Sequence, residues 1–70
     1  MKADILKELR PSVALLLIKT VDLRKKYEEI LIMKYVEDLS YKEISDKLGM
    51  EEESVKNLAC KARKQFDRYA

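Results

Sequence analysis

The hydrophobic positions of this 70-residue chain recur at helical spacings along most of its length. Apolar residues three or four positions apart gather on one face of an α-helix. Pro11 suits the first position of a helix, because its fixed backbone angle is helical and its missing N–H is not needed there. The pattern predicts a helix over about residues 11–23, preceded by a short helical turn around Ile5, Leu6 and Leu9.

A second long helix is predicted in RKKYEEILIMKYVED, residues 24–38. Its apolar residues point to nearly every side of the helix. Neither Pro nor Gly separates this segment from the preceding helix, so the boundary near residues 22–24 stays open.

These two helices carry more apolar residues than one core-facing stripe needs. The stripe expected to face the core in the first helix consists of Val13, Leu16, Leu17 and Val21. The apolar residues left on other faces are Leu15 and Ile18, followed in the second helix by Ile32, Met33 and Val36. Such a surplus indicates either a surface for another protein or a small bundle that encloses its helices more completely.

A clear helix start follows at LSYKEI. The Ser40 hydroxyl can accept from the backbone N–H of Glu43, whose carboxylate can reach back to the N–H of Ser40, while Leu39 can pack against Ile44. Gly49 can take the left-handed conformation that closes a helix. The sequence therefore predicts a short helix that ends at residue 48.

The last helix is expected over about residues 51–66, where the run Glu51, Glu52 and Glu53 would lie favourably at its positive end. Apolar residues recur along this helix and the one before it. They are Ile44 and Leu48 on the first, and Val55, Ala59, Ala62 and Phe66 on the second. Two short helices around a glycine, at about residues 40–67, have the form of a helix-turn-helix.

The polar face of the last helix supplies the candidate DNA-binding residues. They are Ser54, Lys56, Asn57, Lys61, Arg63 and Lys64. Short polar groups near the start of a helix can read base edges, and cations along it can hold phosphates. The whole chain has a net charge of only +2, but residues 54–70 carry five Lys or Arg and a single Asp. An ordinary solvated helix face would show the same pattern.

Composition narrows the class of protein. One Gly, one Pro and 40% charged residues favour an all-α fold, a small bundle of four to five helices forming one domain over residues 1–70. The absence of His and the single Cys60 argue against a metal centre or a disulfide framework and favour a cytoplasmic protein. The sequence shows no pair of carboxylates, no nucleophile with a base and no phosphate-binding glycine loop, so neither an enzyme nor a cofactor is expected. The apolar run VALLLI is far shorter than the roughly 20 residues that span a membrane.

The segment YEEILIMKYVEDLSYKEISDKLGMEEESVKNLACKARKQF, residues 27–66, resembles the fourth conserved region of bacterial RNA polymerase sigma factors, especially the extracytoplasmic-function type. The informative pieces are YVEDLSYKEIS, LGM and SVK followed by KARK. The resemblance implies a helical domain that binds the upstream promoter hexamer in duplex DNA and the flap of the polymerase beta subunit, with a regulatory protein such as an anti-sigma factor as a further partner. By the same resemblance, Ser54, Lys56, Asn57 and Lys61 match DNA-facing positions, with Arg63 and Lys64 nearby.

Two departures weaken the expected DNA binding. Leu58 stands where many of these sigma factors carry Arg, and Glu51 to Glu53 add negative charge at the start of the last helix. A protein-interaction module of the same fold, with little DNA binding, is therefore the alternative. The luminescence-regulator type of helix-turn-helix also carries KEI and VK, but it tends to have a His soon afterwards. A sigma factor also needs a separate domain that grips the polymerase, so the chain is expected to be either a fragment or a free-standing relative.

Overall fold

The described part of the chain, residues 3–69 of a computed structural model, consists of helices joined by short connections and contains no strand. Side chains are described for residues 5–68. The elements are the 3₁₀ turn η1 (Ala3–Lys7), α1 (Pro11–Thr20), α2 (Lys25–Leu31), the π-helical η2 (Ile32–Val36), α3 (Tyr41–Leu48) and α4 (Glu52–Tyr69). Because η2 continues α2 directly, there are four long helical segments in this range. This confirms the predicted all-α class.

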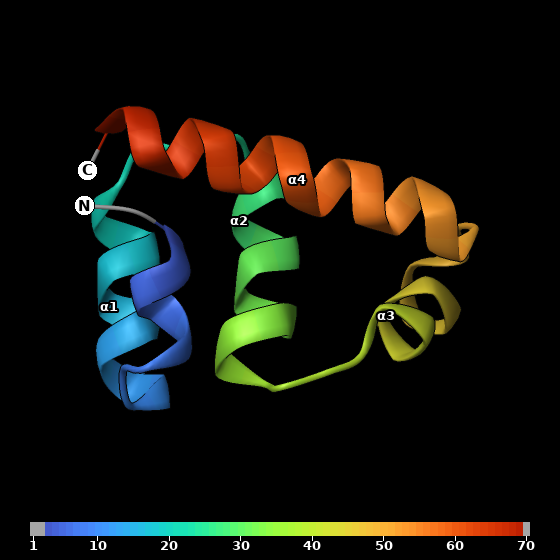
Figure 1. Ribbon diagram of the computed structural model, residues 1–70, viewed down its shortest axis with the longest axis horizontal. Helices are drawn as coiled ribbons and strands as arrows, with labels where there is room; N and C mark the ends of the chain where they lie inside the picture. Colours follow the sequence, from blue (N-terminus) through green and yellow to red (C-terminus); the bar gives the residue numbers. More distant parts are fainter. Residues whose placement is uncertain (1–2, 70) are drawn as a thin grey trace.

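The helices are arranged in two directions (Figure 1). α1 and α2 run side by side, and α4 crosses one end of them. α3 lies beneath the start of α4, on the far side of α2 from α1. α4 packs mainly against α2 and α3 and also contacts η1. None of the helices within residues 3–69 is long and apolar enough to span a bilayer.

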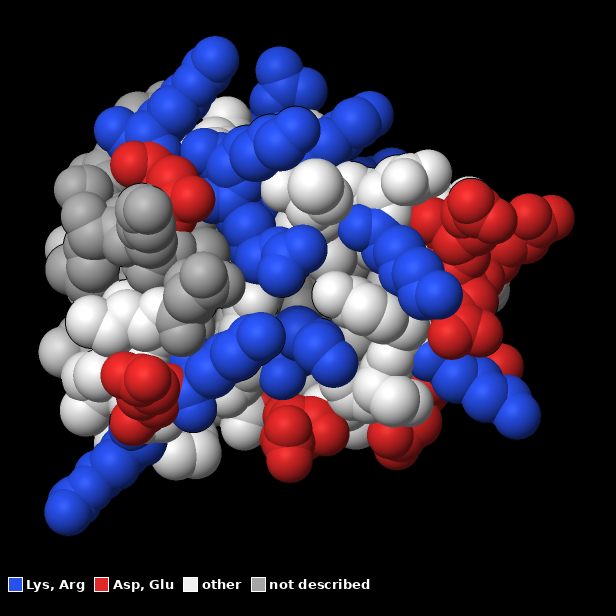
Figure 2. Space-filling view, in the orientation of Figure 1, with Lys and Arg blue, Asp and Glu red and all other residues white. Residues whose placement is uncertain are grey.

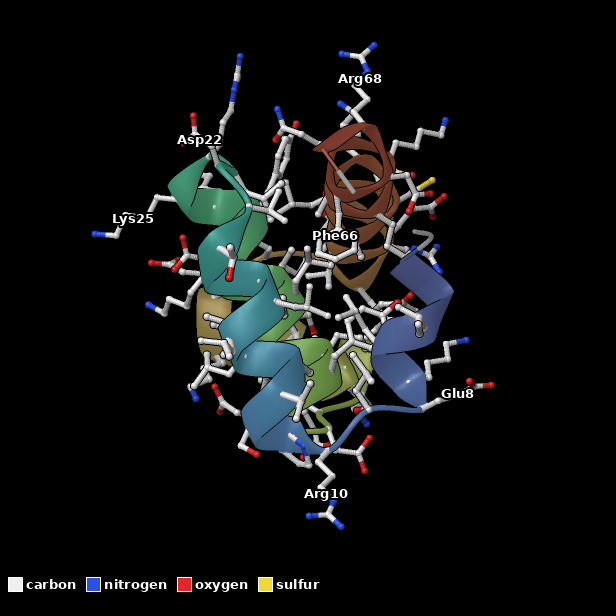
Figure 3. All side chains as sticks on the ribbon, turned by 90° about the vertical axis from the view of Figure 1, so that its left-hand side faces the viewer. Glu8, Arg10, Asp22, Lys25, Phe66 and Arg68 are labelled. Carbon is white, nitrogen blue, oxygen red and sulfur yellow. The ribbon has the colours of Figure 1, made fainter. Side chains whose placement is uncertain are left out.

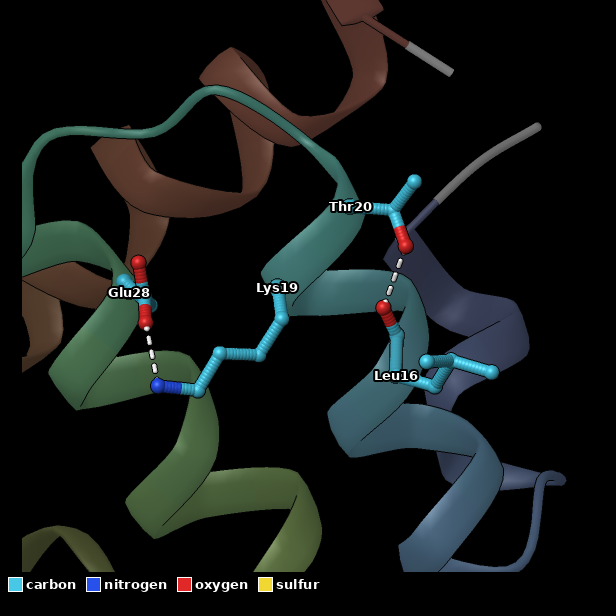
Figure 4. Close-up of polar contacts among 4 residues, drawn as sticks. All are labelled: Leu16, Lys19, Thr20 and Glu28. Atoms are coloured by element: carbon cyan, nitrogen blue, oxygen red, sulfur yellow. Dashed lines mark hydrogen bonds and ion pairs between the residues drawn. The ribbon is translucent and has the colours of Figure 1, made fainter.

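α1 ends at Thr20, three residues before the predicted end. Val21 has an extended backbone, with φ −84° and ψ 136°, although its N–H still donates to the carbonyl of Leu17. In the last turn, the Thr20 hydroxyl donates to the carbonyl of Leu16 (Figure 4). The chain then crosses to α2 in an open connection, which the continuous apolar pattern of the sequence does not reveal.

One ion pair joins α1 to α2. Lys19 Nζ lies 3.0 Å from Glu28 Oε1 (Figure 4). The Lys19 side chain is mostly exposed, and exposed pairs of this kind contribute about 0–1 kcal/mol. Packing between the two helices therefore matters more than this contact.

The predicted core stripe of α1 is confirmed only in part: Leu17 and Val21 are half-buried and pack against the core, but Val13 and Leu16 do not. Ala14 and Ile18 are fully buried, whereas Val13 is 42% and Leu16 69% exposed. α1 packs chiefly against η2, and its Ala14–Ile18 line is the one turned toward that neighbour. When a helix is apolar on most sides, the position of its neighbour decides which side is buried, and the sequence pattern does not specify that position.

The second helix changes its hydrogen bonding halfway along. The N–H of Glu37 donates to the carbonyl of Ile32 at 3.0 Å, five residues back, which defines a π turn. Asp38 then takes a left-handed backbone with φ 57° and turns the chain toward α3. Ile32, Met33 and Val36 are half-buried against the core. In this segment the bundle encloses most of the apolar surplus.

The predicted capping of α3 is confirmed. The N–H of Glu43 donates to Ser40 Oγ, and the N–H of Ser40 donates to Glu43 Oε1, both at 3.1 Å. The bond from the Ser40 backbone stabilises the carboxylate and lowers the pKa of Glu43. Gly49 is left-handed, with φ 68°, and its N–H donates to the carbonyl of Ser45. Both ends of α3 therefore follow from local sequence signals.

α4 supplies the centre of the core. Phe66 is the largest fully buried side chain, and it points inward between α1 and η1 (Figure 3). The remaining buried apolar residues are Leu6, Ala14, Ile18, Leu23, Ile30, Leu31, Ile44, Val55, Ala59 and Ala62. Since every long helical segment contributes to this set or packs against it, the position of α4 is fixed by the whole bundle.

Candidate nucleic-acid interface

The predicted apolar stripe of α4 is confirmed and fixes how this helix is turned. Val55, Ala59, Ala62 and Phe66 are all buried. Since successive residues of an α-helix are rotated by about 100°, the direction in which each remaining side chain leaves α4 follows from this stripe. The outward face is therefore defined by the core.

The six predicted DNA-binding residues fall on two parts of α4. Asn57 and Lys64 leave the helix nearly opposite the buried stripe. Lys61 and Ser54 lie beside them on one side of the helix, where Lys61 approaches the start of α2, and all four are exposed. Lys56 and Arg63, seven residues apart, leave on the other side of the helix, where Arg63 interacts with Tyr35 of η2 and Tyr41 of α3. Lys56 is exposed and Arg63 is half-buried.

Arg63 is engaged inside the domain. Burial lowers the pKa of Arg63, but interactions with Tyr35, including a side-chain hydrogen bond, together with weaker ones with Tyr41 and Cys60, raise the pKa overall. Nearby, Lys34 Nζ lies 4.5 Å from the centre of the Tyr41 ring and donates to the carbonyl of Leu39 at 3.4 Å. These contacts join α4 and α3 to η2. A contact between Arg63 and DNA stays a prediction.

The three glutamates stand at the start of α4. The Glu51 carbonyl accepts from the N–H of Val55 at 3.0 Å, which makes Glu51 the residue that precedes the first turn. Glu52 and Glu53 occupy that turn, and all three side chains are exposed. Negative charge at this end stabilises a helix by roughly 0.3–1 kcal/mol per residue. The run therefore stands at the helix end where the sequence placed it, and its contribution to stability stays a prediction.

Charge is separated along α4 (Figure 2). Acidic side chains gather at the right-hand end of the view, where α4 begins in Figure 1, and basic side chains gather along the upper edge, over its C-terminal half. A polyanion would therefore meet attraction over most of α4 and repulsion at its start.

Leu58 belongs to a different surface. It is half-buried, packs against the core and lines a hollow of about 210 Å³ with Leu48 and Met50. Its apolar side chain thus takes part in packing between α3 and α4. Leu58 therefore supplies no positive charge to the outward face of α4.

The sequence did not single out Arg24 and Arg68 for the site. A cleft of about 260 Å³ lies between the start of α2 and the C-terminal half of α4. Its lining residues are Arg24, Tyr27, Lys61, Lys64, Gln65 and Arg68. Arg24 lies outside the helix-turn-helix in sequence, so only the packing of α4 on α2 reveals its proximity to the predicted site.

Part of this chain matches a known protein family. The sequence model of the family described as sigma-70, region 4 matches residues 22–66. This match covers α2, η2, α3 and most of α4, and it favours the sigma interpretation over the luminescence-regulator type. Neither a search of curated proteins nor a search of solved structures found a match. The chain therefore belongs to the sigma-70 region 4 family, whose members are DNA-binding helix-turn-helix modules of transcription.

Proposed function

We propose that this domain binds duplex promoter DNA at the upstream promoter element, with the outward face of α4 in the major groove, while it contacts the flap of the RNA polymerase beta subunit. One observation carries the proposal: α4 buries its apolar stripe completely and leaves short polar residues and cations exposed on the opposite face. A cytoplasmic location, where promoter DNA is found, belongs to the same proposal.

Different residue types on this face are expected to contact different parts of the DNA. Ser54 and Asn57 lie in the first half of α4 and can hydrogen-bond to base edges; Asn pairs well with adenine. Lys61 and Lys64 lie further along and can hold phosphates. Lys56 approaches from the side of α3. The domain is expected to bind weakly in isolation, because Glu51 to Glu53 repel phosphates near the base-reading residues.

The test is the salt dependence of DNA binding. Each phosphate that a lysine neutralises contributes about −0.9 to the slope of log K against log salt concentration. Changing Lys56 and Lys61 together to Ala should therefore flatten the slope by up to about 1.8, measured by fluorescence anisotropy on promoter DNA. Circular dichroism should show unchanged helical content, because both side chains are exposed. Arg10→Ala, outside α4, is the control. An unchanged slope in the double variant would contradict the proposal.

A protein-interaction module is the second candidate, and the exposed apolar residues of α1 favour it. Val13 and Leu16 lie one turn apart on α1 and face solvent. A polymerase flap fragment or an anti-sigma factor is the partner expected under this candidate. Leu16→Gln should weaken capture of the flap fragment without changing DNA binding. If the lysine double variant binds DNA like the parent while the flap fragment captures both equally well, the interaction module is the better description.

A further inference from the structure

The basic cleft between α2 and α4 has the charge of a site for an anionic group. It has a volume of about 260 Å³ and is open to solvent. Four of its six lining residues are Lys or Arg, and none is Asp or Glu. Asp22 precedes Arg24 by two residues but does not line the cleft. The charge of the lining therefore suits an anionic group such as a phosphate.

The cations reach the cleft from two separate elements. Arg24 comes from the residue just before α2, whereas Lys61, Lys64 and Arg68 come from successive turns of α4. Positive charges brought together in this way repel one another, and a bound anion relieves that repulsion. Arginine also presents a planar set of donors that matches the oxygens of a phosphate.

We propose that this cleft holds a phosphate of the DNA backbone, beside the groove occupied by α4, and that Arg24 is a DNA-contacting residue. The inference rests on the proposed function. Lys61 and Lys64 belong both to the cleft and to the outward face of α4, so a strand that follows this face reaches the cleft. The cleft also lies along the C-terminal half of α4, away from the glutamates that would repel DNA.

The chain offers a closely matched control for Arg24. Arg10 precedes α1 as Arg24 precedes α2, with nearly the same backbone angles (φ −61° for both, ψ 147° and 146°), and neither side chain caps its helix. Both arginines are exposed. Arg10 lies at the opposite end of the molecule from Arg68 (Figure 3). Arg24→Gln and Arg10→Gln therefore remove the same charge from equivalent local structures.

The experiment measures the salt slope of duplex DNA binding for the parent, Arg24→Gln and Arg10→Gln. Arg24→Gln should flatten the slope by about 0.9, the value for one lost phosphate contact, and Arg10→Gln should not. If the parent binds DNA but the two variants have equal slopes, the inference is overturned. A parent that fails to bind DNA would instead overturn both the inference and the proposed function.

Two further probes separate the possible sources of the anion. At constant ionic strength, inorganic phosphate should displace DNA from the parent protein more effectively than from the Arg24→Gln variant. If phosphate shifts the amide resonances around Gln65 of the parent but the DNA slope of Arg24→Gln is unchanged, the cleft is a free-phosphate site and the inference fails. If Arg24→Gln weakens binding of poly-glutamate but leaves DNA binding intact, an acidic protein is the ligand and the inference fails.

Discussion

Neutralising the start of α4 should change stability and DNA binding in opposite directions. Glu52 and Glu53 lie in the first turn of α4 and are exposed. Changing both to Gln keeps their size and removes two charges that interact with the positive end of the helix. At about 0.3–1 kcal/mol per charge, the loss of unfolding free energy is about 0.6–2 kcal/mol.

That loss is large for a domain of this size. A 70-residue domain has an unfolding free energy of roughly 3.5–10 kcal/mol, from about 0.05–0.15 kcal/mol per residue. Its unfolding entropy, at about 2.1 cal/mol/K per residue, is about 0.15 kcal/mol/K. The double variant should therefore melt about 4–14 °C below the parent in circular dichroism.

DNA affinity should rise in the same variant, because two charges that would repel phosphate are gone from the start of α4, which the proposed function places near DNA. The gain should be largest at low salt, since charges separated by more than about 10 Å are screened at 0.1 M. Anisotropy titrations at about 50 and about 200 mM salt measure both effects. Glu8→Gln, an exposed carboxylate outside α4, is the control. A lower melting temperature with unchanged DNA affinity would refute the placement of this helix end near DNA.

Three further predictions concern the scaffold. Gly49→Ala should lower the free energy of unfolding, measured in urea, by about 1–2 kcal/mol, because the backbone at this position is left-handed. No atom lies within 4 Å of the new Cβ, so backbone strain is the only cost. Gly49→Asn should lose less stability, and equal losses in the two variants would contradict this prediction. The pKa of Glu43 is lowered in the folded domain, so its ionised form stabilises the fold at pH values above its unfolded pKa, which is near 4.5. This stabilisation is lost as pH falls through the folded pKa. The gap in melting temperature between the parent and Glu43→Gln should accordingly shrink in acid, and a constant gap would refute the assignment. Phe66→Ala should cost about 3–5 kcal/mol, which approaches the whole stability of the domain, whereas Phe66→Leu should fold; a Phe66→Ala variant that melts like the parent would show that Phe66 is not central.

The ends of α3 and the buried stripe of α4 could be predicted from the sequence because both depend on short-range rules. Ser40 and Glu43 cap each other within one turn, and Gly49 is the residue type that a left-handed helix end favours. The stripe of α4 stands out because polar residues occupy most of the remaining positions of that helix. Sequence signals of this kind do not depend on the positions of other helices.

The remaining features depend on tertiary packing. Ala14 is too small to dominate a hydrophobic pattern, yet it is fully buried where α1 meets η2. The π turn after Leu31 departs from the period on which helix prediction relies. Arg24 joins Lys61 only because α4 crosses the start of α2, and Arg63 turns toward Tyr35 for a similar reason. Each of these outcomes depends on contacts between residues far apart in the chain.

The separation of charge along α4 also has a kinetic consequence. Opposite charges at the two ends of one rigid helix give the domain an electric moment, so the field of a polyanion rotates the domain before the two molecules touch. The end with Arg68 is drawn forward and the end with Glu52 is turned away. Fewer encounters then begin in a useless orientation, and the fraction that proceeds to binding increases most when little salt is present.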